Sequence, residues 1–185
     1  PFSDDVDAND ALAVEKASQQ IMSVVNAFAS AAEGSGASEE KAFESALNSV
    51  VEVVKAKAEK LSDPTATETE QVLDLTNASD LALIKSEVAA KVTELAAEAG
   101  STLNAAAFEA LADETVTAVK NVNDKIATVT DIASDEAKNT FSTTQVLADQ
   151  IKTATQAEAQ NSGSVAGAID FVDPDKVDAA AANSA

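Results

Sequence analysis

Apolar residues recur at three- and four-residue steps through most of this chain, the spacing that places them along one face of an α-helix. Capping and turn residues divide the pattern into segments, with Gly34 and Pro64 after two of them and Asn77 and Ser134 before two others. The sequence therefore predicts an all-α fold, an antiparallel bundle of about five helices joined by short connections. The predicted helices span about residues 10–33, 39–62, 78–99, 104–130 and 135–160.

Each predicted helix carries an apolar face that we expect to be buried. Apolar residues make up 45% of the chain, but roughly half of them are Ala, so we expect a thin core in which helices approach closely. Asn9 or Asp10 is the predicted N-cap of the first helix. The predicted buried residues of the first two helices are Leu12, Ala17, Ile21, Val24, Val25 and Phe28, and Phe43, Ala46, Leu47, Val50, Val51, Val54 and Leu61.

The residue types that carry most protein chemistry near neutral pH do not occur in the sequence. It contains no Cys and no His, and all 12 of its basic residues are Lys. Without His there is no side chain that titrates ordinarily near pH 7, and without Cys there is no thiolate nucleophile. We therefore expect a structural or interacting protein and not an enzyme.

The formal net charge of −20 constrains the partners. Binding of nucleic acid requires clustered cationic side chains, so nucleic acid is not an expected partner. Anionic membrane surfaces are disfavoured for the same reason, and no apolar run is long enough to insert into a bilayer. Carboxylates that repel one another suit high salt and divalent cations, so Ca²⁺ is the one cofactor that we consider.

Composition divides the chain into three parts. Residues 1–9 form an acidic N-terminal segment, residues 10–162 form the helical bundle, and residues 163–185 form an arm or tail. The small-residue stretch 164–172 predicts a short strand or an extended arm, and residues 175–185 predict a weak helix or a frayed tail. Because the chain begins at Pro1, we expect a processed product or an excised piece of a longer protein.

Two acidic groups are candidate Ca²⁺ ligands. The first contains Asp5, Asp7 and Asn9, although the sequence departs from an EF-hand loop, whose glycine and final glutamate positions fall on Asp10 and Lys16. The alternative for this group is a solvated segment with a helix cap. The second group comprises Asp173, Asp175 and Asp178, which are equally suited to form turns around Pro174.

Apolar residues outside the predicted bundle are candidates for self-association. An arm that docks on a second copy would bury them in the contact, whereas the alternative is that they pack on the chain's own bundle. The candidate residues are Phe2, Val165, Ile169, Phe171 and Val172.

Three stretches resemble helical segments of the giant, repetitive RTX-adhesin-type surface and secreted proteins of proteobacteria. They are residues 10–21 (DALAVEKASQQI), 31–38 (AAEGSGAS) and 129–147 (VTDIASDEAKNTFSTTQVL). The resemblance implies an extracellular, calcium-rich setting and a role as spacer, scaffold or adhesive assembly. The chain departs from the calcium-binding repeats of such proteins, because it contains no Gly-Gly-x-Gly-x-Asp nonapeptide.

These observations favour a non-enzymatic structural or interaction module of an extracellular bacterial surface or matrix assembly, self-associating into filaments. Copies of the chain itself, or neighbouring domains of a larger surface protein, are the expected partners. The alternatives are a helical module that binds a ligand in an apolar pocket and a passive spacer within a larger adhesin.

Overall fold

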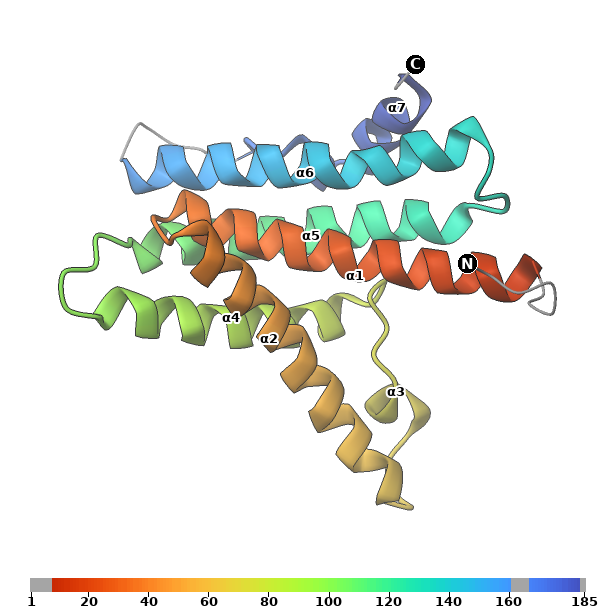
Figure 1. Ribbon diagram of the computed structural model, residues 1–185, viewed down its shortest axis with the longest axis horizontal. Coiled ribbons are helices and arrows are strands. Elements are labelled where there is room, and N and C mark those ends of the chain that lie inside the picture. The colour runs from red at the N-terminus through yellow and green to blue at the C-terminus, as the bar shows by residue number, and fades with distance from the viewer. Residues whose placement is uncertain (1–7, 161–166, 184–185) are drawn as a thin grey trace.

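The computed structural model describes residues 8–160 and 167–183, and all regular structure in these ranges is helical (Figure 1). The predicted all-α class is therefore confirmed. The connector between the second and third predicted helices, residues 63–77, contains a short extra helix, and the C-terminal region contains two more elements. The elements are α1 (Ala8–Gly34), α2 (Glu39–Glu59), η1 (Lys60–Ser62), α3 (Glu68–Gln71), α4 (Ala78–Ala97), α5 (Ala105–Thr128), α6 (Asp135–Ala159), η2 (Asp170–Val172) and α7 (Pro174–Asn183).

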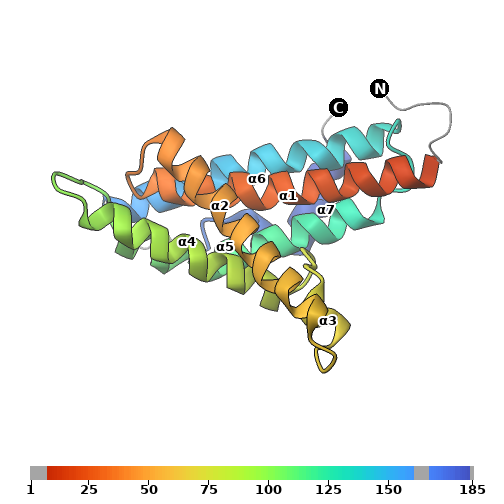
Figure 2. The same ribbon diagram turned by 60° about the horizontal axis from the view of Figure 1, so that its bottom comes forward.

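Four long helices lie along the long axis of the molecule, and α2 crosses them obliquely (Figures 1 and 2). Helix α5 runs antiparallel to α4 and α6, as the short connections predict, whereas α1 and α6 run in the same direction. The extensive α1–α6 contact is closed by the ion pair between Glu33 and Lys152 at the C-terminal ends of both helices. The C-terminal half of α2 projects from the bundle and carries α3 beside its tip.

Local capping explains where several helices begin. The side chains of Asn77, Asn104 and Ser134 each accept a hydrogen bond from a backbone N–H in the first turn of the helix that follows. The first helix begins earlier than predicted, at Ala8, so the assignment of Asn9 or Asp10 as its N-cap is wrong. Both residues lie inside the first turn.

The core is built from single large residues set among Ala. Phe28 of α1 and Phe108 of α5 are fully buried, and aliphatic residues of α4 and α6, including Ile84 and Ile151, are buried with them. Small residues line the close α1–α6 contact: a Cβ atom added at Gly34 would lie 2.6 Å from the carbonyl oxygen of Lys152. The absence of a side chain at Gly34 thus sets how closely the two helices pack.

Gly34→Ala is expected to lower the free energy of unfolding by about 1–3 kcal/mol, because the added methyl group meets the backbone of α6 and forces the helices apart. Urea unfolding followed by circular dichroism measures this change. Ser30→Ala, one turn earlier on α1 at a half-exposed position, is the control and should change stability by less than about 0.5 kcal/mol. Equal effects of the two substitutions would contradict close packing at Gly34.

The C-terminal region folds back on the bundle. Ile169 and Phe171 are buried in the common core, and Val172 packs against it. The side-chain amide of Asn121 on α5 donates hydrogen bonds to the carbonyl oxygens of Phe171 and Val172, at 3.0 and 2.9 Å. The predicted extended arm is therefore wrong for these residues. Their apolar side chains pack on the chain's own bundle, which is the alternative that the sequence left open.

Candidate interaction surface

The helix α2 buries only part of the face that its apolar spacing predicts. Ala46 and Val50 are buried as predicted, whereas the other residues predicted to be buried are about 40–64% exposed and so are available for contact. The exposed apolar residues are Phe43, Leu47, Val51 and Val54 on α2, here called the α2 stripe, and Leu61 on η1. The buried residues of α2 are Ala42, Ser45, Ala46, Ser49, Val50, Val53 and Lys57.

Side-chain size explains this outcome. The apolar arc of α2 is wider than the face that a neighbouring helix can cover, so part of it must stay exposed. Small residues such as Ala42, Ala46 and Ser49 permit close approach to α1 and α4. The hydroxyl of Ser49 donates a hydrogen bond to the carbonyl oxygen of Ser45 at 2.8 Å, so it is satisfied within the helix. The bulky residues are consequently left along one side of the helix.

The α2 stripe borders an open groove of about 450 Å³ between α2, α1 and the segment that precedes α4. Ile21 of α1 is 39% exposed at this groove, and Val72 is 54% exposed. Val54 of the α2 stripe is part of the same lining. The predicted burial of Ile21 is thus wrong, and its side chain extends the apolar surface of α2 onto α1.

A buried ion pair fixes the projecting half of α2. The ammonium of Lys57 lies 2.8 Å from a carboxylate oxygen of Asp80 on α4, and both side chains are about nine-tenths buried. Lys57 also donates to the carbonyl oxygens of Thr69 and Val72 at 2.7 and 2.9 Å, so all three of its protons have acceptors. The second oxygen of Asp80 accepts the backbone N–H of Asp74 at 2.8 Å. One cluster therefore joins α2, the connector and α4.

Carboxylates in the connector are held in their charged form by local hydrogen bonds. The pKa of Asp74 lies below its ordinary value because the hydroxyl and backbone N–H of Thr76 donate to it. The pKa of Glu70 is lowered mainly by the backbone N–H and the hydroxyl of Thr67, with a further contribution from the charge of Lys60. These turns order the backbone whose carbonyl groups bind Lys57.

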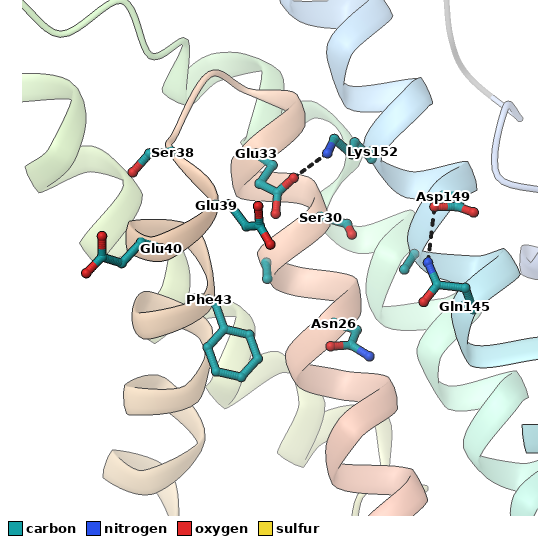
Figure 3. Close-up of a pocket in the computed structure, with 12 residues that line it drawn as sticks. Asn26, Ser30, Glu33, Ser38, Glu39, Glu40, Phe43, Gln145, Asp149 and Lys152 are labelled. Carbon is teal, nitrogen blue, oxygen red and sulfur yellow. Dashed lines mark hydrogen bonds and ion pairs between the residues drawn. The ribbon is translucent and has the colours of Figure 1, made fainter.

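A second, larger groove of about 780 Å³ lies between α1, the start of α2 and α6 (Figure 3). Its lining is polar, and Phe43 points into the space between α2 and α1. The hydrogen bond and the charge of Glu33 raise the pKa of Lys152 at its edge. Asp149 accepts a hydrogen bond from Gln145 at 3.3 Å. Each of these groups is engaged with a neighbour, and the groove presents mainly polar side chains beside the apolar stripe.

The candidate Ca²⁺ ligands have separate roles where the structure describes them. Asn9 lies exposed in the first turn of α1, whereas Asp5 and Asp7 lie outside the described residues. Within residues 8–160 and 167–183, no group of three acidic residues converges in a way that could hold a metal ion. Calcium binding remains a prediction.

In the second candidate group, each Asp has a local partner or position. Asp173 accepts the backbone N–H of Asp175 at 3.0 Å, the turn-forming role that the sequence offered as the alternative. Asp175 occupies the first turn of α7, and Asp178 forms an ion pair with Lys125 of α5 at 3.1 Å. The structure does not bring these three carboxylates together.

The structure describes three of the five candidate self-association residues. Phe2 and Val165 lie outside the described residues. Ile169, Phe171 and Val172 are engaged within the chain, which corrects their assignment to a contact with a second copy. Sequence reasoning instead missed the α2 stripe and the Lys57–Asp80 pair. The small residues Ala42, Ser45, Ala46 and Ser49, spaced at helical intervals, were the signal that could have identified the buried face of α2.

Comparisons with known proteins give this chain no relative: no family model matches it, and no curated protein or solved structure shows a significant similarity. Among the described helices, none combines the length and apolar character needed to cross a membrane.

Proposed function

We propose that this chain is a non-enzymatic structural and interaction module of an extracellular bacterial surface or matrix assembly, and that it associates with other copies through the α2 stripe. The observation that carries the proposal is the row of exposed Phe43, Leu47, Val51 and Val54 along α2, whose C-terminal half projects from the bundle. Contiguous apolar surface of this kind is unusual on a monomer and is typical of protein contacts.

The shape of the surface favours a protein partner. The groove beside α2 is open, whereas sites for small molecules are usually concave and enclose most of the ligand. A helix laid along an apolar groove uses anchors at three- and four-residue steps, which is the spacing of Phe43, Leu47, Val51 and Val54. The resemblance to segments of RTX-adhesin-type proteins supports the extracellular setting.

Leu47→Asp is expected to abolish association of the chain. Wild-type protein should show a mass that rises above 18.8 kDa with concentration in sedimentation experiments, because apolar stripes become buried between copies. The substituted protein should stay at the monomer mass, because the new carboxylate cannot be buried without a large desolvation cost.

Leu83→Asp is the matched control, since Leu83 is also an exposed leucine but lies on α4. It should associate as the wild-type protein does. A wild-type mass that remains monomeric up to high concentration would contradict the proposal. A monomer that instead melts at a higher temperature when a ligand is added would favour the binding module.

A further inference from the structure

Charged residues of both signs occur along α2. The first half carries Glu39, Glu40 and Glu44 together with Lys41, and the second half carries Lys55 and Lys57 together with Glu52 and Glu59. Glu44 follows Phe43 and Lys55 follows Val54, so each lies beside one end of the α2 stripe. Eleven residues correspond to about three helical turns, which places Glu44 and Lys55 on the same side of the helix.

Glu44 and Lys55 are both exposed, and neither has an ion-pair partner among the residues that the structure describes. The other lysines of α2 and the lysine of η1 are engaged, Lys41 with Glu98, Lys57 with Asp80 and Lys60 with Glu70. Glu44 and Lys55 are therefore a free negative and a free positive charge beside the α2 stripe, about 16 Å apart at 1.5 Å per residue. Glu40, one turn before Glu44, is a further exposed carboxylate without an ion pair among the described residues.

We propose that two copies of the chain pair through antiparallel α2 helices related by a two-fold axis, with Glu44 of each copy opposite Lys55 of the other. This pairing rests on the proposed function and specifies its partner. The axis passes between positions 49 and 50, which brings Leu47 and Val51 of both copies to the centre of the contact. Phe43 of one copy then lies within one helical turn of Val54 of the other, beside the open groove.

The two free charges beside the α2 stripe favour a second copy in this orientation. Antiparallel helices set Glu44 opposite Lys55, whereas a parallel pair would align Glu44 with Glu44 and Lys55 with Lys55. Elsewhere the net charge of −20 makes copies repel one another.

The position of α2 limits that repulsion. Its C-terminal half projects from the bundle (Figure 2), so this half of the proposed contact lies away from the acidic surface of the other helices. At physiological salt, charges separated by more than about 8 Å are largely screened. A two-fold contact closes on itself, so this pairing yields a dimer, and growth into a filament would require a second interface.

Charge reversal tests the register. E44K and K55E are each expected to raise the dissociation constant of the dimer about tenfold or more, because each turns two attractive contacts into two repulsive ones. An equimolar mixture of the two variants should associate about as tightly as the wild-type protein. In the mixed pair, the introduced lysine faces the introduced glutamate, and the native Lys55 faces the native Glu44. Failure of the mixture to recover would overturn the pairing.

Cross-linking tests the orientation independently, and the chain has no native Cys to interfere. In the proposed dimer, the two copies of position 51 are offset by about 4.5 Å along the helix axis and those of position 61 by about 35 Å. A short bismaleimide should therefore link V51C dimers and not L61C dimers. Efficient linking of L61C would show a parallel pair and overturn the proposal. If the mass rises with concentration but the charge-reversal and cross-linking results are both negative, the chain associates and the antiparallel pairing is wrong. If the mass never rises, the proposed association and the antiparallel pairing are both wrong.

Discussion

Asp80→Asn is expected to lower the free energy of unfolding by about 3–5 kcal/mol, because it leaves the buried ammonium of Lys57 without a counter-charge. The two side chains are 8% and 11% exposed, so water cannot replace the lost carboxylate without opening the structure. The two carbonyl groups that also bind Lys57 are neutral and cannot offset a whole charge. Urea unfolding followed by circular dichroism measures the loss.

Two further variants separate the ion pair from general damage at this position. Lys57→Met combined with Asp80→Asn should recover part of the loss, because the buried charges are removed together. Glu98→Gln removes the charge from the half-exposed pair with Lys41 and should cost less than about 1 kcal/mol. Strict additivity of the two substitutions in the double variant would contradict a coupled pair.

The Lys57–Asp80 pair also supports the backbone beside the proposed interaction surface. Lys57 binds the carbonyl oxygen of Val72, and Val72 lines the groove beside the α2 stripe. A loosened connector would therefore remove one wall of the groove and release the projecting half of α2. Stability and the proposed association are thus linked through one buried cluster.

Helix positions could be predicted because their determinants are local. Apolar spacing locates the long helices to within a few residues, and Asn77, Asn104 and Ser134 cap the helices that follow them. Gly34 ends α1, and its lack of a side chain has a second use in the contact with α6 that the sequence pattern does not reveal.

The buried face of α2 could be predicted only in part, at Ala46 and Val50, because the rest depends on distant partners. Large apolar residues ordinarily indicate the buried side, but here Ser45 and Ser49 are buried and Phe43 is exposed. In the sequence, Lys57 is one of several lysines near the C-terminal end of the helix, where the helix dipole favours positive charge. Its burial depends on Asp80, which lies on a different helix and supplies the compensating charge.

The C-terminal region was ambiguous for a similar reason. Ile169 and Phe171 are compatible with an arm for a second copy or with packing on the same chain, and local pattern does not separate the two. Asn121, about fifty residues earlier, provides the hydrogen bonds that hold this segment on α5. Only the tertiary structure identifies that partner.

Phe28→Ala is expected to cost about 3–5 kcal/mol of unfolding free energy, whereas the same substitution at Phe43 should cost less than about 1 kcal/mol in dilute solution. Phe28 is fully buried where α1 meets the bundle, so its removal leaves a cavity in a core with few large side chains. Phe43 is 41% exposed on the α2 stripe. Both variants change the same atoms, so the comparison isolates the effect of the environment.

The effect of Phe43→Ala should depend on protein concentration, whereas the effect of Phe28→Ala should not. Phe43→Ala should weaken association while leaving the melting temperature of the dilute monomer close to that of the wild-type protein, because the ring packs mainly when a second copy is present. Phe28→Ala should lower the melting temperature at every concentration. Sedimentation and thermal unfolding over one concentration series measure both effects. If Phe43→Ala destabilises the dilute monomer as much as Phe28→Ala does, the ring belongs to the core of the chain and the α2 stripe is not a surface kept for a partner.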